Sequence, residues 1–184
     1  MSRMQRPEAN EYHPNYQKYF DLTYEKYFDL VSAGDYLQIL DRNRTETIKF
    51  FETISPEKHD FRYTQGKWTI KEVLMHIIDT ERVFAYRALA AARGDETPVH
   101  RMDEELYARN VDVSRRTLSD LISEFKAVRT ATEYLFQNVT EDQSRRSCNV
   151  VTHPMTTRAI GYFMIGHVQH HIGIVNERYL GEKV

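Results

Sequence analysis

The chain has 184 residues, enough for one domain with its own hydrophobic core. Its 25 Lys and Arg residues nearly balance its 27 Asp and Glu residues, which gives a formal net charge of −2. A protein dedicated to nucleic acid or to an anionic membrane usually carries an excess of positive charge, so we expect neither partner.

Cys148 is the only cysteine, which excludes an intramolecular disulfide and a zinc site built from several cysteines. No stretch approaches the ~18 apolar residues that suggest a membrane span. The first residues also lack the apolar core of a secretory signal, so we expect a cytoplasmic protein.

Residues 1–34 form a polar leader with many aromatic side chains. They include Tyr12, Tyr16, Tyr19, Phe20, Tyr24, Tyr27 and Phe28. So many rings are costly to leave in water, and we expect this extension to pack on the rest of the chain or on a second subunit. We assign residues 35–184 to a separate helical domain.

Apolar residues at helical spacing predict a first helix over about 35–54 and a second over about 70–93. The first ends before Pro56, because a proline pushes the residue before it out of the α region. The second begins with a capping box, in which the side chains of Thr69 and Glu72 each bond a backbone amide of the first turn.

Two further helices are predicted over about 117–138 and 157–180. The link over 95–116 contains a short helical turn near 103–109, and it is long enough to cross the whole bundle. Such a crossing would make the second and third helices parallel. We interpret 139–156 as a polar loop, and no run of residues predicts a strand convincingly. The sequence therefore predicts an all-α protein with the architecture of a four-helix bundle.

Two histidines lie one turn apart on the last predicted helix. At ~100° per residue, His167 and His171 fall on one side of its apolar face, and His170 lies further out. This spacing lets two imidazole nitrogens reach one metal ion at about 2.0–2.1 Å. Two satisfied core histidines are the alternative, although a cation would also explain why neighbouring imidazoles are buried.

His76 is a candidate for the third ligand that a complete site needs. It lies at the margin of the apolar face of the second helix, beside Val73 and Thr80, where a side chain can point between helices. Its position alone favours an ordinary boundary residue over a ligand.

Two segments resemble the DinB-like family, a superfamily of four-helix bundles named for damage-inducible proteins. They are residues 66–95, GKWTIKEVLMHIIDTERVFAYRALAAARGD, and residues 156–180, TTRAIGYFMIGHVQHHIGIVNERYL. The family pattern has one histidine in the helix after a Trp-Thr pair and two histidines separated by three residues in the last helix. Because His76, His167 and His171 match these positions, the resemblance implies that they hold a metal.

The resemblance also implies a class of function. Three imidazoles leave coordination positions open, and zinc or nickel would suit them equally. Some family members transfer low-molecular-weight thiols such as bacillithiol, mycothiol or glutathione to electrophiles, and others are regarded as metal-dependent hydrolases. We therefore expect a metal-dependent enzyme acting on a small molecule, and a homodimer. The alternatives are a non-catalytic metal- or ligand-binding stress-response protein, and a scaffold in which the histidines are a remnant and the leader mediates assembly.

Other candidate residues are less specific. Glu81 falls on the apolar face of the second helix, where pairing with a buried arginine is a simpler role than general base. His100 and His153 lie in predicted loops, which often supply substrate contacts but more often leave histidines in solvent. We expect His170 to face solvent or a neighbouring helix rather than a metal.

Overall fold

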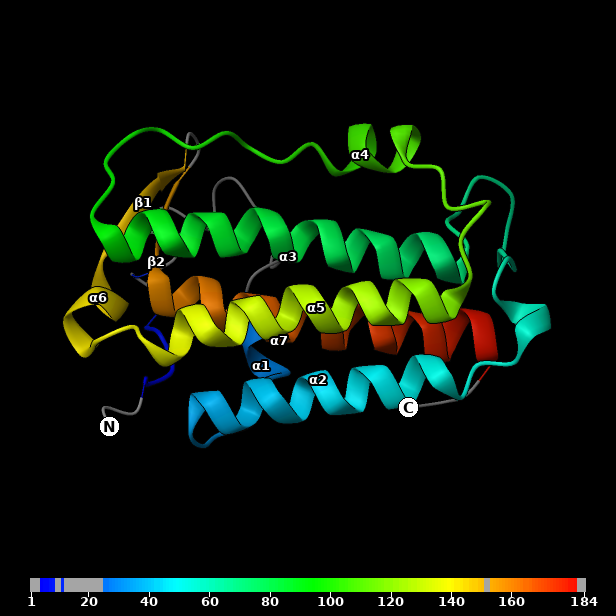
Figure 1. Ribbon diagram of the computed structural model, residues 1–184, viewed down its shortest axis with the longest axis horizontal. Helices are drawn as coiled ribbons and strands as arrows, with labels where there is room; N and C mark the ends of the chain where they lie inside the picture. Colours follow the sequence, from blue (N-terminus) through cyan, green and yellow to red (C-terminus); the bar gives the residue numbers. More distant parts are fainter. Residues whose placement is uncertain (1–3, 9–10, 12–24, 151–152, 182–184) are drawn as a thin grey trace.

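The structure is a computed structural model, and it describes residues 4–8, 11, 25–150 and 153–181 (Figure 1). Four long helices lie side by side: α2 (Tyr36–Glu52), α3 (Ile70–Arg93), α5 (Leu118–Gln137) and α7 (Thr157–Ile174). Helices α2 and α3 each pack against both α5 and α7, so the four enclose a common core. None of the described helices is long and apolar enough to cross a membrane.

The other described elements are short and flank the bundle. They are α1 (Glu25–Asp29), η3 (Pro56–Lys58), α4 (Glu104–Asn110), α6 (Glu141–Arg145), β1 (Ser147–Val150), β2 (His153–Thr156) and η4 (Val175–Leu180). Helix α7 passes directly into η4, which has the wider turns of a π-helix. The fourth predicted helix is therefore continuous to Leu180.

The helix ends follow the capping residues in the sequence. At the start of α3, the Thr69 hydroxyl accepts from the Glu72 amide at 3.1 Å, and the Glu72 carboxylate accepts from the Thr69 amide at 2.6 Å. Gly94 ends the helix in the left-handed region, with a φ of 71°. Thr117 begins a second capping box at the start of α5, and the Asp35 carboxylate caps α2 by accepting from the Gln38 amide. The four predicted helices are thus confirmed.

The order of the helices differs from a simple up-and-down bundle. Helices α2 and α7 run in one direction, and α3 and α5 run in the other (Figure 1). The link between α3 and α5 carries α4 along the outside of α3, back to the end at which α3 began. Helices α3 and α5 are therefore parallel, as the length of this link predicts.

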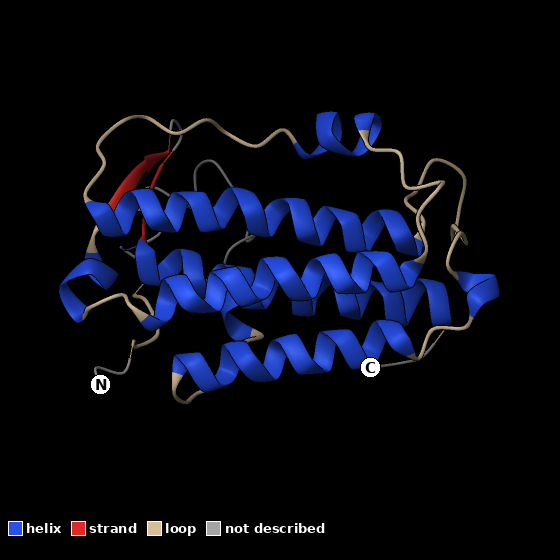
Figure 2. Ribbon diagram, viewed as in Figure 1, coloured by secondary structure: helices blue, strands red, loops and turns tan. Residues whose placement is uncertain are grey.

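The segment 139–156 was predicted to be a loop, and that prediction was wrong. It holds α6 and a two-stranded antiparallel sheet (Figure 2). Cys148 of β1 stands opposite Met155 of β2, and both side chains are buried. Strands of four residues bury so few side chains that the sequence hardly shows the alternating pattern of a strand.

Part of the aromatic extension packs on the bundle. Helix α1 lies on α7, and Tyr27, Phe28 and Val31 are buried. The contact is close at Gly166, where a Cβ atom would overlap the carbonyl oxygen of Tyr27. The other predicted rings, Tyr12, Tyr16, Tyr19, Phe20 and Tyr24, lie outside the described residues. The domain boundary after residue 34 stays a prediction.

The core consists of two apolar clusters with a polar layer between them. On α7, one cluster extends to Ile165 and the other begins at Val168. In the layer, the fully buried Arg129 of α5 donates to both carboxylate oxygens of Glu81 on α3, at 2.6 and 2.7 Å. Arg129 also donates to Asn43 Oδ1 on α2, at 2.6 Å. This network connects three of the four long helices.

Removing one charge of the Glu81–Arg129 pair should destabilise the fold strongly. Glu81→Gln leaves the Arg129 guanidinium buried without its counter-charge, which we expect to lower the free energy of unfolding by about 3–5 kcal/mol. Urea denaturation measures this change. The matched control is Arg82→Gln, which breaks a partly exposed pair with Glu124 and should cost about 0–1 kcal/mol. Equal losses in the two variants would contradict the structural role of the buried pair.

The Cys148 thiol should be unreactive in the folded protein. Its side chain is fully buried, and burial raises the pKa of the thiol, so less of the nucleophilic thiolate is present at a given pH. We expect iodoacetamide to modify Cys148 only after denaturation, as followed by intact-protein mass spectrometry. Native protein that reacts as fast as unfolded protein would show that the hairpin does not protect this residue.

Candidate metal centre

Three histidines from two helices direct their ring nitrogens towards one another. The Nε2 atom of His167 lies 3.1 Å from Nε2 of His76 and 3.1 Å from Nε2 of His171. The three potential ligand atoms all lie within 4.8 Å of one another. Two nitrogens bound to one tetrahedral ion at about 2.0–2.1 Å stand about 3.3–3.4 Å apart. The structure therefore brings together the three residues that the sequence singles out, and two of the three nitrogen pairs lie close to the separation that one ion imposes.

The Nε2 atom of His167 has two ring nitrogens within hydrogen-bonding distance but can bond only one of them. A neutral imidazole nitrogen either donates one hydrogen or accepts at one lone pair. The Nε2 atom of His167 can therefore bond only one of the two nitrogens that lie 3.1 Å from it. A cation between the rings would accept a lone pair from each of the three nitrogens, so the arrangement fits a metal better than it fits hydrogen bonds.

Burial keeps the three rings neutral. The exposed fractions of His76 and His167 are 7% and 6%, and His171 is partly buried. Burial lowers the pKa of His76 to about 4. The pKa values of His167 and His171 lie well below 6.5, first because of burial and then because of the neighbouring histidines. At neutral pH the three rings thus present lone pairs rather than positive charges.

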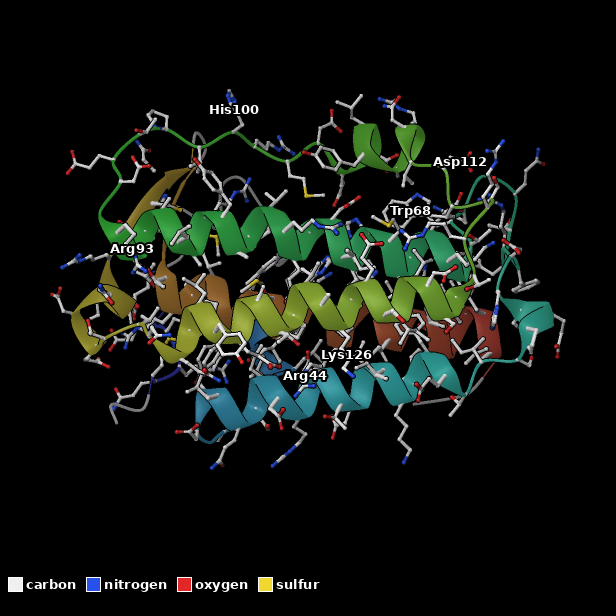
Figure 3. All side chains as sticks on the ribbon, in the orientation of Figure 1. Arg44, Trp68, Arg93, His100, Asp112 and Lys126 are labelled. Atoms are coloured by element: carbon white, nitrogen blue, oxygen red, sulfur yellow. The ribbon has the colours of Figure 1, made fainter. Side chains whose placement is uncertain are left out.

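The start of α3 positions His76. Arg62 donates to both oxygens of the capping residue Glu72, at 2.8 and 3.2 Å. Trp68 lies just before the helix (Figure 3), and its ring centre is 4.8 Å from that of His76. The Tyr179 hydroxyl on η4 donates to the Trp68 carbonyl at 2.7 Å. The C-terminal end of the last helix thus anchors the backbone of Trp68, whose ring lies against His76.

Aromatic rings also surround His167 on α7. Phe163 stacks on His167 with ring centres 5.5 Å apart, and the Tyr27 ring of α1 lies 5.8 Å from His167 and 5.1 Å from His170. His170 is half-buried and does not belong to the cluster of three nitrogens. Its pKa is lowered to about 4, first by burial and then by the positive charges of Lys26 and Arg178.

A small pocket lies beside His76, with α3 on one side and α4 on the other. Its cavity volume is only about 10 Å³, and its lining residues are Glu72, His76, Asp79, Tyr107, Ala108 and Val111. The half-buried Asp79 carboxylate has its pKa raised by burial, and Arg82 approaches it only at 3.4 Å. The sequence did not identify Tyr107 as part of this pocket, because no local pattern relates the long link to α3.

The remaining candidates lie away from the three nitrogens. Glu81 is bound by Arg129, which confirms the structural role favoured for it. His100 is exposed and points away from the bundle (Figure 3). His153 belongs to β2 rather than to a loop.

A sequence profile of the DinB superfamily matches residues 39–175. No curated protein matches the chain. YfiT from Bacillus subtilis, described as a probable metal-dependent hydrolase with an unusual four-helix bundle topology, shares the fold with a TM-score of 0.69. Its sequence is 20% identical, over 80% of this chain and 87% of that chain.

A mycothiol-dependent maleylpyruvate isomerase also shares the fold, with a TM-score of 0.60 and 12% identity. The match covers 79% of this chain but only 61% of the isomerase. At such low identities the two structures show a common fold and nothing more. The profile match spans most of the chain, and it shows that this protein belongs to the DinB superfamily.

Proposed function

We propose that this chain binds one divalent metal ion, with His76, His167 and His171 as its ligands. The observation that carries the proposal is the convergence of three Nε2 atoms, with His167 at 3.1 Å from each of the other two. Neutral imidazoles suit zinc or nickel, whereas magnesium and calcium prefer oxygen ligands. Three protein ligands also leave at least one coordination position for water or substrate.

We further propose that the metal serves a reaction on a small molecule, either thiol transfer or hydrolysis. A metal in such a site lowers the pKa of the water or thiol that it binds. The names of the two structural neighbours support this proposal, since one is a probable metal-dependent hydrolase and the other depends on mycothiol. A low-molecular-weight thiol is therefore the first substrate to test.

The pocket beside His76 offers groups that such a reaction needs. Asp79 carries a carboxylate whose raised pKa lets it hold a proton nearer to neutral pH than an exposed aspartate does. Tyr107 lines the pocket from α4. The pocket has a cavity volume of only about 10 Å³, which is room for about one water molecule rather than for a substrate. This small volume is the observation that favours the alternative, a non-catalytic metal- or ligand-binding protein.

The metal content of untagged protein tests the ligand assignment. By mass spectrometry we expect about one equivalent of zinc or nickel in the wild type and almost none in His76→Ala or His167→Ala, because two imidazoles hold an ion much less tightly than three. His170→Ala is the matched control, since it removes a neighbouring histidine outside the cluster, and it should retain the metal. Wild-type protein that stays metal-free after reconstitution would contradict the proposal.

Thiol-transfer assays distinguish a catalytic role for this protein from a purely binding role. Metal-loaded protein should accelerate the reaction of bacillithiol, mycothiol or glutathione with a general electrophile such as chlorodinitrobenzene. Asp79→Asn should keep its metal but lower the rate, because the amide cannot accept the proton. If metal-loaded protein catalyses thiol transfer and ester hydrolysis no faster than metal-free protein does, the binding role is the better description.

A further inference from the structure

Helix α1 lies on the part of α7 that carries the histidines. The Tyr27 ring contacts three rings of α7, with centre distances of 5.2 Å to Phe163, 5.8 Å to His167 and 5.1 Å to His170. These three positions follow the helical period, so they form one stripe along α7. His167 belongs to this stripe, and together with His171 it also belongs to the histidine pair that faces α3. Tyr27 therefore flanks the metal centre from the outer side of α7.

Gly166 makes this arrangement possible. A Cβ atom there would overlap the backbone carbonyl of Tyr27, so α1 and α7 touch backbone to backbone. Gly173, about two turns further along the same helix, has no atom within 4 Å of the place where its Cβ would stand. Of these two glycines, only Gly166 has a role in seating α1.

We propose that α1 is a wall of the metal centre and that Tyr27 is a positioning residue for His167. This inference rests on the proposed function, since it presupposes that the site binds a metal. Tyr27 meets His167 edge-on, at an interplanar angle of 65°, while Phe163 stacks on the same imidazole at 29°. Two differently oriented rings leave the imidazole little freedom to turn away from the other ligands.

The wall has a second effect on the site. Tyr27 is buried and its ring lies against that of the half-buried His170, so α1 keeps water from this flank of His167. Side chains that orient a ligating histidine contribute strongly to metal affinity although they never touch the metal. Helix α1 is then part of the site rather than an appendage of the bundle.

Cobalt(II) is a suitable probe, because its visible absorption reports the coordination and its transfer to EDTA can be timed. Tyr27→Ala should release cobalt about tenfold to a hundredfold faster than the wild type, the usual effect of losing an outer neighbour of a ligand. Its visible spectrum should also change as His167 gains freedom. Tyr27→Phe keeps the ring and should release cobalt at the wild-type rate with the wild-type spectrum.

Gly166→Ala should reproduce the effect of Tyr27→Ala without altering the ring, because α1 has to move away from the new methyl group. Gly173→Ala is the matched control on the same helix, and it should leave both the spectrum and the release rate unchanged. Circular dichroism establishes that each variant is folded. If Gly166→Ala does not fold, Tyr27→Ala decides by itself.

Wild-type spectra and release rates in Tyr27→Ala would overturn the role of α1 while leaving the metal site intact. A wild-type spectrum and release rate in folded Gly166→Ala would likewise count against a role for α1. Wild-type protein that binds no cobalt would instead overturn the proposed function, and with it the basis of this inference.

Discussion

The buried pair between Glu81 and Arg129 determines which way helix α3 faces. Both side chains are almost completely buried, so α3 cannot turn about its axis without leaving a charge unpaired in the core. His76 precedes Glu81 by five residues, which places it about 140° around the helix at ~100° per residue. Because Glu81 is fixed towards α5, His76 faces α7, the other long helix that packs most closely on α3. The ion pair is thus the constraint that brings His76 to within 3.1 Å of His167.

Helix α7 supplies two of the three nitrogens, and its glycines let other elements approach it closely. A Cβ atom on Gly161 would stand 2.6 Å from the Tyr36 hydroxyl of α2, and one on Gly166 would overlap the backbone of α1. Each glycine in a helix costs about 1 kcal/mol relative to alanine. Close packing of α2 on one side and α1 on the other offsets this cost. Held between them, α7 presents His167 and His171 to α3.

The helices and two of the candidate ligands could be predicted because their signals are local. Capping boxes span four residues, and His167 and His171 lie one turn apart, so a short stretch of sequence defines each relation. His76 stands 91 residues from His167, and only the family resemblance connected the two. Tyr27 had no such signal, because the ring packs on a helix far away in the sequence. The short helix α6 was missed although Thr140 begins a capping box, since five residues are too few to show periodicity.

The charge of the donors bears on what a metal at this site would do. Three neutral imidazoles would leave a divalent ion with its full charge, whereas several thiolates would neutralise it in a closed structural site. Two carboxylates line the pocket beside His76, and each already has an arginine partner: Glu72 pairs with Arg62, and Asp79 pairs with Arg82 at 3.4 Å. An ion held in this way attracts an anionic ligand such as hydroxide or a thiolate into its open position. The charge balance would then be completed by the substrate rather than by the protein, which is why we favour a reactive site over a structural one.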